Sequence, residues 1–106
     1  MSFPRWVKVL DTRIFQPDTG IPFRIQAEGK ELVLLKDLQG NWKAWEPLCP
    51  HEKASLRGIR PDENNCIICP LHRYSFSLEN GHEKHNRARL YLYPVEERNF
   101  EIFVGL

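Results

Sequence analysis

Residues 49–72 read CPHEKASLRGIRPDENNCIICPLH, and they contain two short segments of one kind, Cys49-Pro50-His51 and Cys69-Pro70-Leu71-His72. Each segment offers one thiolate sulfur and one imidazole nitrogen. These are side chains that hold zinc, iron or copper in proteins. The sequence therefore predicts a metal centre built from two loops, and the rest of the chain is interpreted around it.

The order of the donors separates two kinds of centre. In the usual zinc patterns like donors pair within one segment, as Cys-x-x-Cys followed by a His pair. Here each segment pairs one Cys with one His. That arrangement suits a two-iron two-sulfur cluster in which two Cys bind one iron and two His bind the other, because the donors of one loop can reach neighbouring irons. A single zinc ion remains the alternative at this point.

The residues around the segments resemble a known family, the Rieske ferredoxins, whose pattern is Cys-x-His followed by Cys-x-x-His. Residues 74–78, which read YSFSL, and Asn80-Gly81 are similar to the strand and turn that follow the second loop in that family. Residues 90–95 and 99–104 look like its closing strands. The resemblance covers the chain from about Trp42 onward, and the first forty residues by strand pattern only.

The resemblance implies one 2Fe-2S cluster, with Cys49 and Cys69 on the inner iron and His51 and His72 on the outer one. It also implies an electron carrier without an enzymatic reaction of its own. Such a carrier takes one electron from a flavoprotein reductase and passes it to an acceptor, for example a ring-hydroxylating oxygenase. No nucleophile–base pair, phosphate loop or catalytic carboxylate pair is evident in the sequence.

The surroundings of the cluster predict a low reduction potential. High-potential members of the resembled family have an extra Cys in each loop, joined as a disulfide, and a Ser and a Tyr that donate hydrogen bonds to sulfur. The matching positions carry Ala54, Leu71, Tyr74 and Phe76. With fewer donors to stabilise the reduced state, we expect a potential near about −150 mV. We also expect Pro50, Pro70 and Leu71 to keep the sulfurs dry.

Two other functions compete with the electron carrier. One is a small regulatory subunit resembling that of assimilatory nitrite reductases, many of which lack the four ligands. The other is an interaction module with a structural zinc ion. The presence of all four donors argues against the first, and the colour of the purified protein separates the second, because zinc is colourless.

Composition limits the class of protein. A chain of 106 residues predicts one domain, residues 1–106. The net charge of +1 gives no general attraction to nucleic acid or anionic membranes. No window approaches the roughly 20 apolar residues of a membrane span, and no signal peptide is visible. With two of three Cys assigned to the cluster, Cys66 has no disulfide partner, which favours a reducing, cytoplasmic location.

Short alternating segments separated by Gly, Pro, Asn and Asp predict an all-β fold without helices. We expect an antiparallel, Rieske-like β-sandwich, with a cluster-binding region of residues 46–82 inserted into the β base and made of the two ligand loops. The expected strands cover residues 6–10, 23–27, 31–36, 42–46, 66–68, 74–78, 90–95 and 99–104.

For three residues near the predicted ligands we expect structural roles rather than metal binding. We expect Cys66 to be a small buried side chain, and His82 and His85 to lie in a solvated loop. That loop lacks the prolines that many members of the resembled family carry in the loop that covers the cluster. The charged pair Glu52-Lys53 is expected to shape a docking surface.

Overall fold

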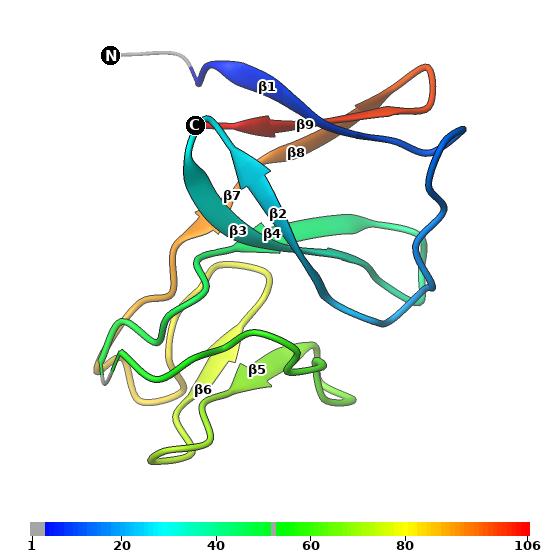
Figure 1. The fold of residues 1–106 in the computed structure, drawn as a ribbon. Coiled ribbons are helices and arrows are strands. Elements are labelled where there is room, and N and C mark those ends of the chain that lie inside the picture. The colour runs from blue at the N-terminus through cyan, green and yellow to red at the C-terminus, as the bar shows by residue number, and fades with distance from the viewer. Residues whose placement is uncertain (1–3, 52) are drawn as a thin grey trace.

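The structure is a computed structural model that describes residues 4–51 and 53–106. Within these residues every regular element is a β-strand and none is a helix, which confirms the all-β prediction (Figure 1). Consequently no helix of the described residues could span a membrane. The strands are β1 (Trp6–Asp11), β2 (Phe23–Ala27), β3 (Lys30–Lys36), β4 (Trp42–Trp45), β5 (Cys66–Ile68), β6 (Ser75–Ser77), β7 (Leu92–Tyr93), β8 (Val95–Arg98) and β9 (Glu101–Gly105).

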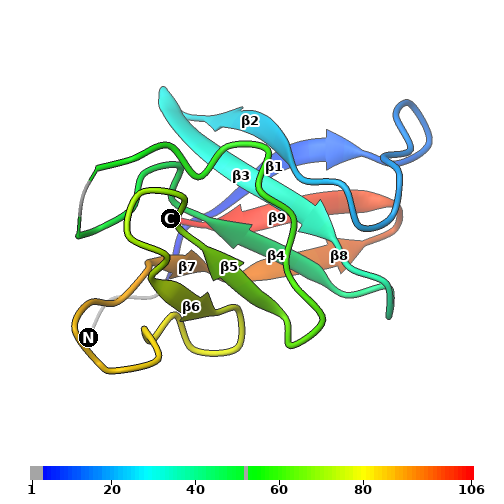
Figure 2. The same cartoon turned by 90° about the horizontal axis from the view of Figure 1, so that it is seen from below.

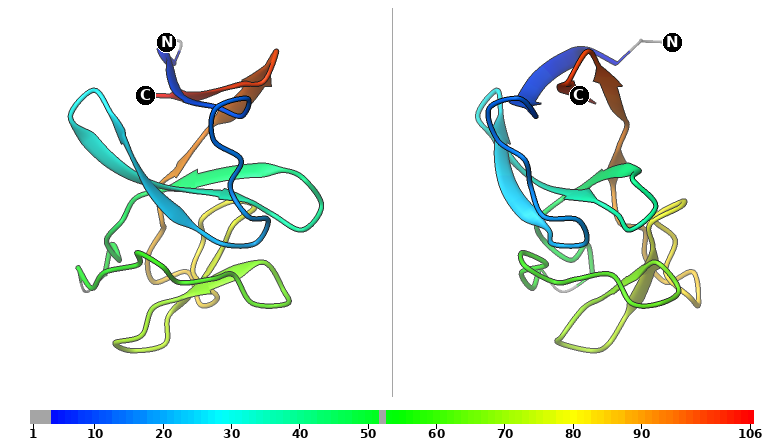
Figure 3. Two further views of the ribbon diagram at one scale, coloured as in Figure 1. Left: turned by 45° about the vertical axis from the view of Figure 1, so that its right-hand side comes forward. Right: turned by 90° about the vertical axis from the view of Figure 1, so that its right-hand side faces the viewer.

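The strands form three antiparallel sheets that lie one below another in Figure 1. The first sheet has the order β1-β9-β8, the second β2-β3-β4-β7, and the third is the β5–β6 hairpin. The first two make up the β base. Figure 3 shows the same order from two further sides, with β5 and β6 on the far side of the four-stranded sheet from β1 and β9.

Strand β3 explains why the apolar run at residues 32–35 is continuous. Leu32 and Leu34 pack into the cores shared with Val104 and Ile102 of β9. Val33 and Leu35 belong to the other core, which contains Cys49 and Cys69, the two cysteines of the predicted ligand set. Since β3 is covered on both faces, its sequence lacks the apolar–polar alternation of a half-buried strand. The same strand thus joins the base to the cluster-binding region.

Two expected strands differ from the structure by more than one residue at an end. The segment at residues 90–95 is divided at Pro94, because β7 belongs to the four-stranded sheet and β8 to the three-stranded one. Proline has no N–H for a ladder, and its carbonyl instead accepts a hydrogen bond from Gly105 N at 2.9 Å. The last strand begins at Glu101 because Asn99 and Phe100 have positive φ and form a tight turn between β8 and β9.

Candidate functional site

The two ligand loops lie beside each other at the end of the molecule opposite the chain termini (Figure 1). The first loop follows β4 and is closed by a bridge between Leu48 and Ser55. The second connects β5 to β6, which pair from Cys66↔Ser77 to Ile68↔Ser75. The second loop is therefore the tip of a hairpin, and the first is closed by a single bridge.

The backbones of the two loops repeat the same hydrogen bonds. Cys49 N donates to Ala54 O and Cys49 O accepts from Lys53 N, both at 2.8 Å. In the second loop Cys69 N donates to Tyr74 O at 2.8 Å, and Cys69 O accepts from Arg73 N at 2.9 Å. In each loop the chain thus returns to its Cys within a few residues, so the Cys is held at the base and the His is carried on the outward turn.

Burial separates the Cys donors from the His donors. Cys49 and Cys69 are 0% exposed, whereas His51 and His72 are exposed. The imidazole centroids lie 6.4 Å apart with the ring planes at 84°. The cysteines belong to a core whose other buried members are Val33, Leu35, Trp45, Leu56, Ile67, Phe76, Leu78 and Leu90.

The apolar core packs around the cysteines, and the loop residues expected to keep the sulfurs dry lie nearer the surface. Leu71 is 54% exposed, Pro70 is exposed, and Pro50 is half-buried. All three follow a buried Cys in the loop segments that carry His51 and His72. That Pro50, Pro70 and Leu71 keep the sulfurs dry stays a prediction.

Tyr74 lies against the first His, although it belongs to the second loop. Its hydroxyl is 3.2 Å from His51 Nε2, and the ring centroids are 4.3 Å apart. The guanidinium of Arg87 lies 3.9 Å from the centroid of the Tyr74 ring. From its sequence position Tyr74 could be either a packed aromatic or a hydrogen-bond donor. The structure shows that it packs and that its hydroxyl faces His51.

A third loop, the segment with His82 and His85 between β6 and β7, is anchored by a carboxylate that the sequence did not single out. The side chain of Glu83 is 1% exposed and accepts hydrogen bonds from the backbone N–H of His85 (3.0 Å) and Arg87 (3.2 Å). It also pairs with the guanidinium of Arg87 at 3.0 Å. This guanidinium, with the two N–H groups, lowers the pKa of Glu83 from its ordinary 4.5 to about 2. Glu83 therefore fixes the loop that places Arg87 over Tyr74.

The remaining residues singled out near the ligand loops differ in their exposure to solvent. His82 and His85 are exposed, as expected of a solvated loop. Cys66 is only half-buried, contrary to expectation, because it lies on the outer face of β5 while Ile67 faces the core. Lys53 is exposed, and Glu52 lies outside the described residues.

The donor set fits a bridged cluster better than a single zinc ion. Four donors of one zinc ion must converge on one point. A two-iron cluster needs instead a buried pair of sulfurs and a separate pair of nitrogens, and the burial of the two Cys and the exposure of the two His match that requirement.

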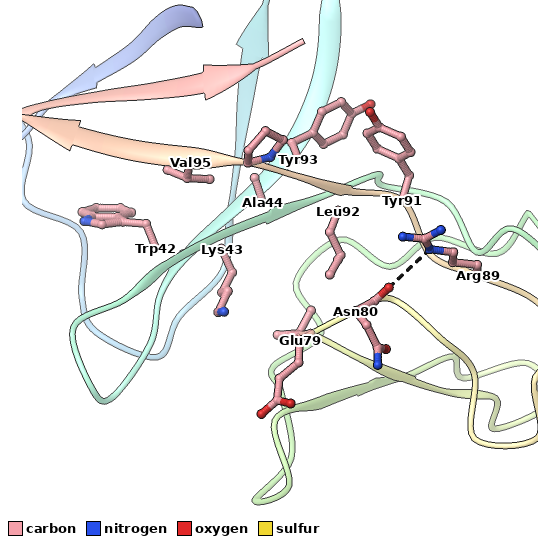
Figure 4. Close-up of a pocket in the computed structure, with 12 residues that line it drawn as sticks. Trp42, Lys43, Ala44, Glu79, Asn80, Arg89, Tyr91, Leu92, Tyr93 and Val95 are labelled. Atoms are coloured by element: carbon pink, nitrogen blue, oxygen red, sulfur yellow. Dashed lines mark hydrogen bonds between the residues drawn. The ribbon is translucent and has the colours of Figure 1, made fainter. Parts of the chain in front are cut away.

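A separate groove of about 570 Å³ lies between the β base and the turn that follows β6 (Figure 4). Its lining includes Trp42, Tyr91 and Tyr93 and none of the four predicted ligands. At one end Arg89 Nε donates to Asn80 O at 3.3 Å, which links the third loop to this turn. The groove is therefore distinct from the ligand loops.

Comparison with known proteins identifies related sequences. The model of the family described as "Rieske [2Fe-2S] domain" matches residues 5–94. The ferredoxin component of the alkene monooxygenase system of Xanthobacter autotrophicus is 30% identical over 79 residues, which cover 73% of this chain and 64% of that protein. Chloroplastic pheophorbide a oxygenase of rice is 38% identical over 60 residues, 56% of this chain. The chain spans only 11% of that oxygenase's length.

Several solved structures have the same fold as this chain. The ferredoxin of carbazole 1,9a-dioxygenase from Nocardioides aromaticivorans superposes with a TM-score of 0.78 and 27% identity, covering 98% of both chains. A small subunit of an NADH-dependent nitrite reductase from Mycobacterium tuberculosis has a TM-score of 0.83 at 15% identity, covering 99% of this chain and 97% of that one, a likeness of fold alone. The chain belongs to the Rieske [2Fe-2S] domain family, and its cofactor is one 2Fe-2S cluster of the Rieske type.

Proposed function

We propose that the protein is a one-electron carrier, a Rieske ferredoxin whose cluster is held by Cys49, His51, Cys69 and His72. The observation that carries the proposal is the contrast between the two donor pairs. The Cys pair is fully buried in an apolar core, and the His pair is exposed with its rings 6.4 Å apart. One face of the bound group is thus kept from water, and the other is open to a partner.

The cluster supplies a reversible one-electron step when bound. The chain's own contribution is to position and shield it. The core around Cys49 and Cys69 excludes water from the sulfur side. The paired backbone hydrogen bonds at each Cys fix the loops, and Tyr74 fixes the ring of His51. We infer that electrons enter and leave at the exposed imidazole edges.

The partners we propose are a flavoprotein reductase as donor and a terminal oxygenase as acceptor, in the cytoplasm. Two of the similar proteins are named as ferredoxins of oxygenase systems. One belongs to an alkene monooxygenase system and the other to a carbazole dioxygenase. A solved complex pairs an oxygenase with the carbazole dioxygenase ferredoxin. On this proposal the protein has no enzymatic reaction of its own.

A low potential near about −150 mV is part of the proposal. Phe76 packs in the same core as both cysteines and has no hydroxyl to donate to sulfur. The Tyr74 hydroxyl is directed to a His ring. Fewer hydrogen bonds to the sulfurs leave the added charge of the reduced state less stabilised, which lowers the potential.

The experiment begins with anaerobically purified protein. Two iron atoms and two labile sulfides per chain, with a visible spectrum that bleaches on reduction by dithionite, are expected. Voltammetry should then give a potential close to the lower end of the Rieske range. Colourless protein containing zinc would overturn the proposal in favour of the interaction module, and a clearly positive potential would refute only the argument about missing donors.

A further inference from the structure

The outer face of the β5–β6 hairpin forms a groove of about 550 Å³ beside the second ligand loop. Strand pairing places Cys66 opposite Ser77 and Ile68 opposite Ser75, and these four side chains line the groove. Phe76, between the two serines, is fully buried on the other face. Figure 2, seen from below, shows no described strand in front of β5 and β6. We call this hollow the β5–β6 groove.

Basic side chains border the β5–β6 groove. Arg73, Lys84 and Arg87 line it, and Arg73 and Lys84 form no ion pair with any side chain of residues 4–51 and 53–106. Of the two acids in the lining, Glu83 is buried and paired with Arg87. The other, Asp62, accepts backbone hydrogen bonds of its own turn. The exposed charge around the groove is therefore predominantly positive.

Arg73 and Lys53 occupy equivalent positions of the two ligand loops, four residues after the Cys of each loop. Arg73 has φ 57°, a left-handed conformation that glycine adopts freely and side-chain-bearing residues adopt rarely. The equivalent position of the first ligand loop is also basic, because Lys53 has φ 60° and makes the same bond to its Cys. Each ligand loop thus carries a cation close to its predicted His ligand.

We propose that the β5–β6 groove binds an acidic segment of the protein that exchanges electrons with this chain, an inference that rests on the proposed function. The floor offers apolar contact, since Ile68 is 37% exposed, and the rim offers cations. The groove reaches the redox site at two points. Arg73 directly follows His72, and Arg87 lies against the Tyr74 ring that contacts His51.

The charge of the groove is tested with two small oxidants of opposite charge, ferricyanide and tris(phenanthroline)cobalt(III). Each takes one electron from the dithionite-reduced protein, and stopped-flow absorbance follows the oxidation. Neutralising the rim with R73Q/K84Q should slow oxidation by ferricyanide about tenfold at low salt, and the difference should disappear near 1 M salt. The same variant should react faster with the cobalt complex.

The opposite-sign oxidants separate steering from a changed driving force, because an altered potential would move both rates in the same direction. The matched control is R24Q/K30Q, which removes one Arg and one Lys from exposed positions of the β base. It should change either rate less than twofold. Equal effects of the two double variants, or unchanged rates in R73Q/K84Q, would overturn the proposal.

The partner chemistry is tested with a short peptide of alternating Asp and Leu. It should slow the ferricyanide oxidation of the wild-type protein and leave that of R73Q/K84Q unaffected, whereas a Lys–Leu peptide should slow neither. Equal slowing of both proteins by the acidic peptide would place its binding elsewhere and refute the groove as the docking site. Failure of the proposed function is recognised separately, because a protein without a cluster shows no bleaching with dithionite at all.

Discussion

The hydroxyl of Tyr74 lies 3.2 Å from Nε2 of His51, so a residue of the second ligand loop holds the imidazole of the first. The aromatic ring adds a packing contact, with centroids 4.3 Å apart. Arg87 of the third loop lies on the same Tyr74 ring. Three loops that are distant in sequence are thus connected at one exposed His, and the contact should resist loss of the cluster.

Removing the Tyr74 hydroxyl tests this connection. Tyr74→Phe keeps the ring and deletes one hydrogen bond of about 1 kcal/mol, so the cluster should be lost about fivefold faster. The decay of visible absorbance in the presence of a chelator measures this rate. Tyr91→Phe, at a 54% exposed ring away from the ligands, is the control and should decay as the wild type does. Equal rates of cluster loss for Tyr74→Phe and wild type would show that the hydroxyl does not stabilise the cluster.

The buried carboxylate of Glu83 predicts a particular acid sensitivity. Its pKa is lowered from 4.5 to about 2 in the folded protein by the Arg87 guanidinium and the N–H groups of His85 and Arg87. A lowered pKa means that the ionised group stabilises the fold above about pH 4.5 and that this stabilisation is lost as the pH falls towards 2. Glu83→Gln should therefore be less stable than wild type at pH 7, and the gap should narrow on acidification.

Urea unfolding of both proteins at several pH values between 7 and 3 measures that gap. Glu79→Gln provides the control, because Glu79 is an exposed carboxylate on the preceding turn and is not part of the Glu83–Arg87 pair. A difference between wild type and Glu83→Gln that stays constant with pH would contradict the role of the ionised Glu83.

Gly81 should not tolerate a side chain. It has φ +79°, and an added Cβ would lie 2.1 Å from the backbone oxygen of Leu90. Gly81 and Leu90 also exchange a hydrogen bond, from Leu90 N to Gly81 O at 2.7 Å. Gly81→Ala should destabilise the protein by about 2 kcal/mol or more, as measured by chemical unfolding.

The loss of stability in Gly81→Ala has two causes, the positive φ and the clash with Leu90. A substitution at Gly29 tests the first cause alone. Gly29 has nearly the same φ, +80°, and an added Cβ there meets nothing within 4 Å. Gly29→Ala should therefore cost only the backbone preference, about 1 kcal/mol. If both substitutions had the same effect, the close approach to Leu90 would have no energetic consequence.

Binding of the cluster should require Cys69 but not Cys66. Cys69→Ser removes a proposed ligand, and the purified variant should contain almost no iron or sulfide. Cys66→Ser changes a half-buried side chain on the outer face of β5 and should retain both at the wild-type level. Iron and sulfide analysis with the visible spectrum decides the result. A colourless Cys66→Ser together with an intact Cys69→Ser would reverse the ligand assignment.

The strand pattern and the donor set could be predicted from local sequence. Alternation, turn residues and the spacing of Cys and His are properties of neighbouring residues, so the all-β class and the ligand loops are visible without coordinates. The continuous run of β3 also predicted a buried strand, and Val33 and Leu34 are indeed 0% exposed. The assignment of Cys49, His51, Cys69 and His72 as ligands stays a prediction.

The three-dimensional fold alone decided the surroundings of those donors. Glu83 lies in a charged segment that reads as solvated, yet Arg87 and two N–H groups make its burial possible. Tyr74 meets His51 because the two ligand loops converge. The division of one apolar segment at Pro94 follows from the position of two sheets. Each of these depends on contacts between residues far apart in the chain, which local periodicity does not encode.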